Sequence, residues 1–183
     1  MTRIFRIIAS LNTLLLLASL GSGIVSWLER GIERDAPVYV VHFVLGLTTA
    51  LTTLFVHCLV LTYFLGTGRW VKEVCLAYGL PDDDVPRQTR DIKRRNTPRV
   101  LFAMAVTVLT AAAGMAAQQR AWPGWIHFVL ALGTLAVNGY VFVVEYANVR
   151  LNGQLLDAVV ARAERIRFER GLPSSEEALR ETE

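Results

Sequence analysis

Two histidines in matching apolar segments are the residues of this chain best suited to do chemistry. Residues 41–49, which contain His42, align without a gap with residues 126–134, which contain His127. A neutral imidazole nitrogen can ligate a metal ion, and an imidazole can also take up or release a proton near neutral pH. A repeat of this kind in a membrane chain indicates two similar helical hairpins, which would place the two histidines at matching depths.

These histidines lie in two of four long apolar segments, each of 18 or more residues with almost no charge: residues 4–27, 38–65, 100–117 and 125–147. About 20 residues of helix cross the hydrocarbon layer of a membrane. The sequence therefore predicts an all-α membrane protein whose four transmembrane helices form two tandem hairpins. The first segment has no clean small-x-small cleavage site, so we expect it to be a span and not a removed signal.

The basic residues predict the orientation, because Lys and Arg beside a span are retained on the cytoplasmic side. Of the 19 Lys and Arg residues, two precede the first span, eight lie between residues 69 and 99, and six follow the fourth span, against three in the other two connections. We expect both termini, the 67–98 connection and the 149–183 tail to be cytoplasmic, in a bacterial inner membrane. The net charge of +3 is explained by this topology, and no motif indicates binding of nucleic acid.

The expected cytoplasmic segments show helical patterns. Apolar residues recur at helical spacing in residues 70–78 and 149–169, and both runs stop at a glycine, Gly79 or Gly171, followed by Leu-Pro. We expect amphipathic helices that continue the second and fourth spans and pack on each other or on the membrane surface. The residues expected to pack are Trp70, Val74 and Tyr78 in the first helix and Leu155, Val159 and Ile166 in the second.

Two polar runs follow these glycines. Asp82–Asp84 could bind a divalent cation, but three consecutive carboxylates more commonly form a solvated run. Ser174 or Ser175 is expected to cap a final short helix, with Glu176 or Glu177 near its start.

Polar and small residues form one stripe along each histidine-bearing span. At about 100° per residue, the second span aligns His42, Gly46, Thr49, Thr53 and His57. The same spacing in the fourth span gives His127, Ala131, Thr134, Asn138 and Phe142, with Glu145 close by. Such stripes turn inward in lipid, because small residues let helices approach and polar groups seek partners. In one interpretation the stripes serve helix packing alone.

In the second interpretation His42 and His127 are the two axial ligands of one b-type haem, with Gly46 and Ala131 leaving room for the porphyrin. Two imidazoles give a low-spin iron suited to electron transfer. The placing of His42 and His57 about four turns apart on one helix resembles the plan of membrane cytochrome b subunits. This resemblance covers two spans, rests on no family sequence motif and implies a redox role. The sequence departs from this plan at Phe142, which occupies the position where a second haem ligand opposite His57 is expected. A second haem would therefore need a dimer or another subunit.

His57 and Glu145 form a second candidate site. They differ by about one turn in depth, so either they share a hydrogen bond that serves a proton relay or a quinone site, or Glu145 reaches the inner interface. A non-haem metal at His42 and His127 would lack a third ligand, except for Asp35 in the outer connection. The sequence contains no phosphate-binding loop and no nucleophile with a base, so we do not expect this chain to be an enzyme by itself.

The sequence thus predicts a small membrane protein that binds haem b through His42 and His127, as a redox subunit or anchor. Its expected partners are the lipid bilayer and, in this role, a protein partner or a second copy of the chain, with quinone as an exchange partner for electrons. The alternative is a non-catalytic scaffold or assembly protein without a cofactor. A small transporter fits less well, because the four spans carry few charged groups and no broken helix is evident.

Overall fold

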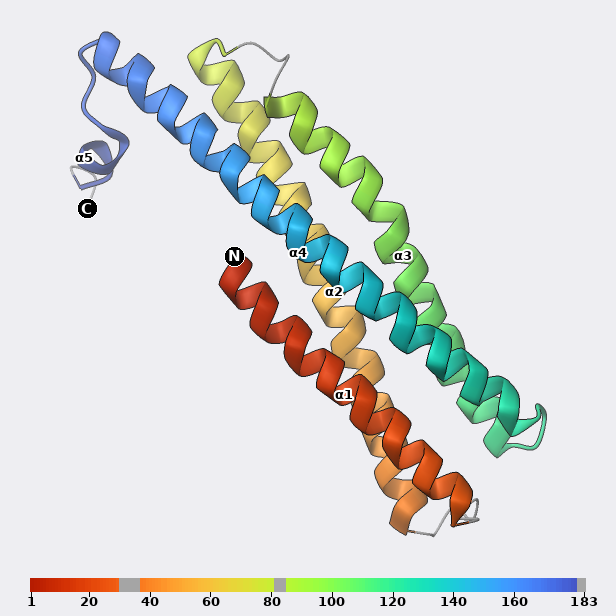
Figure 1. Cartoon of the computed structure of the whole chain (residues 1–183). Coiled ribbons are helices and arrows are strands. Elements are labelled where there is room, and N and C mark those ends of the chain that lie inside the picture. Colours follow the sequence, from red (N-terminus) through yellow and green to blue (C-terminus); the bar gives the residue numbers. More distant parts are fainter. Residues whose placement is uncertain (30–36, 81–84, 181–183) are drawn as a thin grey trace.

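The computed structural model of the protein describes residues 1–29, 37–80 and 85–180, and all regular structure in these ranges is helical. Four long helices are followed by a short one (Figure 1): α1 (Thr2–Leu28), α2 (Pro37–Tyr78), α3 (Val85–Gln118), α4 (Gly124–Glu169) and α5 (Ser175–Arg180). The first four each contain a stretch long and apolar enough to cross a membrane. The predictions of an all-helical protein and of four apolar helices are confirmed.

The four long helices form an antiparallel bundle in which each is joined to the next at alternate ends (Figure 1). Neighbours around the bundle are α1 with α2, α2 with α3, α3 with α4, and α4 with α1, while α2 and α4 also touch across the interior. Because the direction alternates, α2 and α4 run parallel. We call the end where these two helices begin the histidine end, and the end where they finish the extension end.

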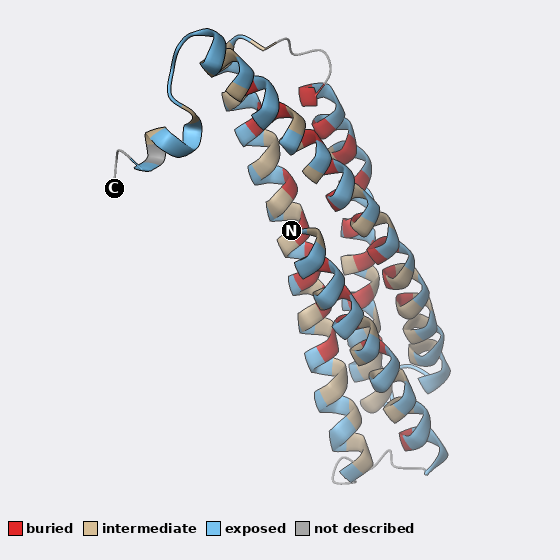
Figure 2. Ribbon diagram, turned by 60° about the vertical axis from the view of Figure 1, so that its left-hand side comes forward, coloured by how far each residue is buried: buried red, intermediate tan, exposed pale blue. Residues whose placement is uncertain are grey.

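Most of the apolar surface faces away from the bundle. Only 17–28% of the residues in the four apolar windows are buried inside the structure, and large apolar side chains such as Leu14, Leu51 and Val143 are 60–70% exposed. Buried residues follow the faces turned toward other helices (Figure 2). An apolar surface this large, on helices of span length, is expected where the surrounding medium is the hydrocarbon of a lipid bilayer. The chain is an integral membrane protein.

The long helices exceed the thickness of a membrane. At 1.5 Å per residue, α2 with 42 residues and α4 with 46 are about 60–70 Å long, against about 30 Å of hydrocarbon. The helix α1 begins partway along the bundle, so α2, α3 and α4 alone make up the extension end (Figure 1). Their buried residues here include Val71, Cys75, Val85, Ile92, Leu155 and Val159.

Two expectations about this extension need correction. Trp70 does not pack inward, because it is 39% exposed while the next residue, Val71, is fully buried. The inward face of α2 is therefore shifted by one position, with Val74 and Tyr78 only partly buried. Residues 85–98, expected to be part of a connection, form the first turns of α3. The many basic residues and Pro98 made this segment resemble a connection. Its buried face is narrow and includes Val85, Pro86, Thr89, Ile92 and Asn96.

The two Gly-Leu-Pro sequences end their helices as predicted. Gly79 has φ +66° and Gly171 has φ +65°, the left-handed conformation that glycine adopts without a steric cost. The following N–H groups bond back across the last turn, Leu80 to the carbonyl of Cys75 and Leu172 to that of Arg167, both at 2.9 Å. Both ends are Schellman motifs. The Asp82–Asp84 run and Asp35 lie outside the described residues.

The short helix α5 begins with the expected cap. The Ser174 N–H donates to the Glu177 carboxylate at 2.8 Å and the Glu177 N–H donates to the Ser174 hydroxyl oxygen at 3.2 Å, which is the reciprocal pattern of a capping box. Donation by the backbone N–H and by the hydroxyl of Ser174 lowers the pKa of the Glu177 carboxyl. Ser174 and Glu177, rather than Ser175 and Glu176, are thus the capping residues.

Candidate functional site

The first candidate site is the histidine pair, His42 and His127, near the start of α2 and α4. Their ring centroids are 6.1 Å apart and the ring planes are inclined by 66°. Both side chains are half-buried. The parallel direction of α2 and α4 and the similar distance of each histidine from its helix start bring the rings together, as the matching segments predicted.

Each ring is oriented by a backbone carbonyl of the neighbouring helix. His42 Nδ1 lies 3.2 Å from the carbonyl oxygen of Ser19 and 3.2 Å from the hydroxyl oxygen of Ser22 on α1. His127 Nδ1 lies 3.0 Å from the carbonyl oxygen of Thr110 on α3. A carbonyl oxygen only accepts, so Nδ1 must be the protonated nitrogen in both rings. The neutral rings therefore carry their free lone pair on Nε2.

A glycine lies against each ring. A Cβ atom at Gly23 of α1 would lie 2.8 Å from His42 Cε1, and a Cβ atom at Gly114 of α3 would lie 2.9 Å from His127 Cε1. Side chains do not approach this closely, so any other residue at either position would displace the ring. The two histidines thus have equivalent surroundings, with one carbonyl and one glycine four residues apart on the adjacent helix.

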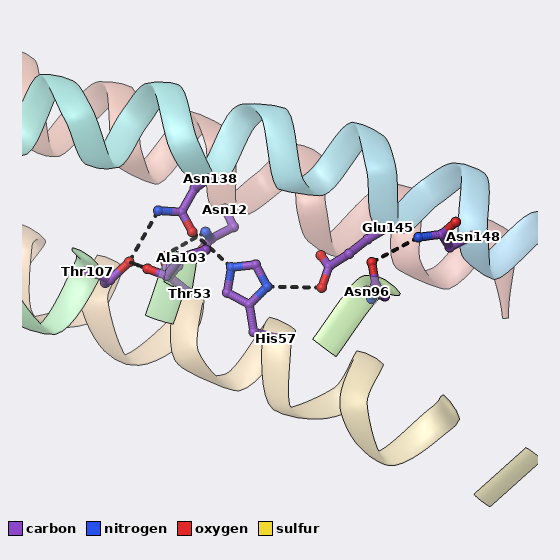
Figure 3. Close-up of polar contacts among 9 residues, drawn as sticks. All are labelled: Asn12, Thr53, His57, Asn96, Ala103, Thr107, Asn138, Glu145 and Asn148. Atoms are coloured by element: carbon purple, nitrogen blue, oxygen red, sulfur yellow. Dashed lines mark hydrogen bonds and ion pairs between the residues drawn. The ribbon is translucent and has the colours of Figure 1, made fainter. Parts of the chain in front are cut away.

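The second candidate site is a buried polar network around His57 (Figure 3). His57 Nδ1 is 3.1 Å from Glu145 Oε1, and His57 Nε2 is 2.9 Å from Asn138 Oδ1. Asn138 Nδ2 donates to the carbonyl of Thr134 at 2.8 Å and to the hydroxyl of Thr107 at 3.2 Å. His57, Asn138 and Glu145 are 0% exposed, so α2 and α4 meet here through a polar contact in the interior.

This network decides between the two arrangements expected for Glu145, because its side chain is fully buried and contacts His57. His57 also points into its own bundle, where it stacks on Phe142 with ring centroids 5.2 Å apart.

Several of these contacts were not expected from the sequence. The stripes along α2 and α4 do not identify Gly23, Gly114 or the carbonyls of Ser19 and Thr110, because a pattern along one helix does not state which residues of a neighbouring helix lie beside it. A signal was present in the first and third spans, since each has a hydroxyl residue four positions before a glycine. Other polar groups crossing the interior include Asn12 with Thr53, Asn148 with Asn96, and Asn152 with Thr67.

Comparison of the chain with protein-family models, with curated proteins and with solved structures finds no match. The fold and the site therefore define a class alone: an integral membrane protein with four long helices, a histidine pair at one end of the bundle and a buried histidine–carboxyl contact inside it.

Proposed function

We propose that the protein holds one b-type haem between His42 and His127 and passes electrons within the membrane. The observation that carries this proposal is the close approach of two histidines from parallel helices, whose ring centroids are 6.1 Å apart and whose Nδ1 atoms bond to backbone carbonyls. Neither Nε2 has a hydrogen-bond partner among the described residues. Ligating histidines commonly donate their other N–H to a backbone carbonyl, which fixes the ring, and both rings have that arrangement.

The spacing of the rings suits one metal ion. A metal-to-imidazole bond is about 2 Å and the ring centre lies about 1 Å further on, so two rings on opposite sides of one ion have centres about 6 Å apart. The observed centroid distance is 6.1 Å. The separation of the rings thus supports a pair of axial ligands, which the rings would form by turning their Nε2 atoms toward a common centre.

The number of donors supports haem over a bare metal ion. Within the part of the chain that the structure describes, no group of three or more His, Cys, Asp or Glu side chains comes together. Two histidines suit an iron whose four other ligands belong to a porphyrin, which when bound supplies one-electron chemistry. The residues four positions after the two histidines, Gly46 on α2 and Ala131 on α4, are small, which supports room for a porphyrin.

The equivalent surroundings of the two histidines support the tandem-hairpin repeat. Ser19 and Gly23 stand to His42 as Thr110 and Gly114 stand to His127, and α2 and α4 end in the same capping motif. We propose that α1–α2 and α3–α4 are two copies of one hairpin. The distribution of basic residues supports a topology with the extension end and both termini in the cytoplasm, as in a protein of a bacterial inner membrane.

We propose that the protein is a redox subunit or anchor whose extension end contacts a protein partner. The three-helix extension provides a surface outside the membrane for such contact. Quinone is the expected electron-exchange partner in the lipid phase. His57 and Glu145 are fully buried, which suits a group that exchanges protons better than a group that binds quinone.

The visible spectrum of the purified protein tests the haem proposal. The wild-type protein is expected to show the sharp reduced bands of bis-histidine haem. His42→Ala and His127→Ala should each abolish or convert this spectrum, and the double variant should be little worse than either single one, because two ligands of one iron act as a unit.

His57→Ala is the matched control, since it removes the third histidine of the same chain and should leave the spectrum largely intact. A wild-type protein free of haem, with spectrum and stability unchanged by both substitutions in the histidine pair, would contradict the proposal. In that case the non-catalytic scaffold, in which the stripes serve packing alone, would account for the bundle.

A further inference from the structure

The bonding around Asn138 determines where the protons of the buried network lie. Asn138 Nδ2 faces the carbonyl of Thr134, which only accepts, so Oδ1 is the atom that faces His57. His57 Nε2 must therefore carry a hydrogen. The 3.1 Å contact between His57 Nδ1 and Glu145 Oε1 then holds one proton, on the imidazole or on the carboxyl. In either position the pair is neutral overall, which burial in a membrane favours.

One oxygen atom of the His57–Glu145 pair has no hydrogen-bond partner among the described residues. Glu145 Oε2 is buried and has no hydrogen-bond partner in the described ranges, and the same holds for Asn96 Nδ2 and Asn152 Oδ1. These atoms lie on the extension side of His57, on α3 and α4 (Figure 3 shows Glu145 and Asn96). Buried polar atoms in folded proteins nearly always have a partner, and ordered water commonly supplies it.

A surface pocket lies on the same two helices, and its lining includes Asn148. It measures about 390 Å³, lies between α3 and α4 in the extension, and is lined by Gln88, Asp91, Ile92, Arg95, Arg99, Asn148 and Leu151. Asn148 is half-buried at the pocket and donates to Asn96 Oδ1 at 2.9 Å. Asn96 and Glu145 are both fully buried, and Figure 3 draws them on the same side of His57. The amides of Asn148 and Asn96 thus form a polar connection from the pocket toward Glu145.

We propose that water reaches Glu145 from this pocket past Asn148 and Asn96, and that the His57–Glu145 pair is a proton-exchange site open to the extension end alone. A hydronium ion that transfers its proton to Oε2 leaves a water molecule and makes the pair singly positive. Release of a proton to water along the same route restores the neutral pair. On the other side of His57, the Asn138 oxygen has no proton to pass on, so the site is closed toward the histidine pair.

Hydrogen exchange at the His57 ring tests this route. The chain has three histidines, so the ring resonances of protein labelled with ¹⁵N-histidine can be assigned from single substitutions. The measurement is the rate at which the His57 ring N–H signals disappear after transfer of the full-length protein in detergent from H₂O to D₂O.

Asn148→Leu should slow this exchange at least tenfold, because an apolar side chain replaces the first polar group of the route. Asn148→Ser keeps a hydroxyl there and should exchange near the wild-type rate. Leu151→Trp, at a pocket residue that is 43% exposed, should also slow exchange by filling the pocket. The Leu151→Trp substitution does not alter the buried polar network, so this variant tests the route even if Asn148→Leu does not fold.

Thr107→Val is the control on the opposite side of His57 and should not slow the exchange. A wild-type rate in both Asn148→Leu and Leu151→Trp, or slowing by Thr107→Val alone, would overturn the proposal. The readout needs no haem, so its failure is distinguishable from a failure of the proposed haem site, which the visible spectrum reports.

Discussion

At the scale of single residues, the position of each histidine ring depends on a glycine of the adjacent helix, which has no Cβ atom. Each ring occupies the space that a Cβ atom would fill on the adjacent helix, at Gly23 and at Gly114. A ring held by one Nδ1–H bond to a backbone carbonyl and pressed against a glycine has little freedom to turn. These glycines are therefore positioning residues, which act on the site through the rings of His42 and His127.

Gly23→Ala should destabilise the protein by about 1–3 kcal/mol, the usual cost of overpacking a well-packed site, because the His42 ring must leave its carbonyl. Gly21→Ala, two residues away with nothing within 4 Å of its added Cβ, should instead stabilise the helix by about 0.5–1 kcal/mol. Detergent-induced unfolding measures both. In a His42→Ala background the cost of Gly23→Ala should largely disappear, and its persistence would show that the ring is not its cause.

At the scale of helices, the chain uses the same end signal twice. The helices α2 and α4 both continue far beyond the length that a membrane requires, and both stop where a glycine takes a positive φ. The length of each extension is thus set by the position of one residue. The partly buried side chain of Leu80, directly after Gly79, packs against the main core cluster, which ties the end of α2 to the bundle.

Gly171→Ala should weaken the end of α4 by about 1–2 kcal/mol, because an L-residue at positive φ pays a steric cost. The measurement is hydrogen exchange of the Leu172 amide, which bonds to the Arg167 carbonyl and should exchange faster in the variant. Gly153→Ala lies inside the same helix, with nothing within 4 Å of the added Cβ, and should leave that amide unchanged or slightly protected. Equal effects of the two substitutions would show that the left-handed cap is not what ends α4.

At the scale of the whole molecule, the two ends of the bundle differ in charge, and at one end three helices extend beyond the start of α1. Sixteen of the 19 basic residues lie at the extension end or beside the start of α1. This asymmetry carries the proposed orientation, with the histidine pair near the outer surface and the pocket of the proton route facing the cytoplasm. The proposed haem site and the opening of the proposed proton route would then lie toward opposite ends of the bundle.

Cysteine labelling in intact cells tests this orientation. In a variant without Cys58 and Cys75, a cysteine at Asp83 should react only with a permeant reagent, whereas one at Glu33 or at exposed Gln119 should react with an impermeant one. The bias in Lys and Arg normally decides insertion. Labelling of Asp83→Cys by the impermeant reagent would reverse the topology and, with it, the side to which the proton route opens.

The sequence by itself determined the helices of this protein and, for much of their length, which side of each helix turns toward the interior. Four apolar segments of span length predict four helices, because lipid admits only structures whose backbone groups are bonded internally. The stripe from His42 to His57 turns inward as periodicity requires, since Thr49, Thr53 and His57 are all buried. The glycines that end α2 and α4 were also predictable, because few other residues adopt positive φ.

Only the tertiary structure decided which groups meet. A single helix pattern does not state which neighbour lies beside it, so Gly23, Gly114 and the carbonyls that orient the histidine rings came from packing between helices. The same holds for Glu145, for which interface and interior were both compatible with its position along α4. Its burial against His57 follows from the rotation and depth of α2 and α4, which depend on contacts made by all four helices at once and not on the spacing of residues within one of them.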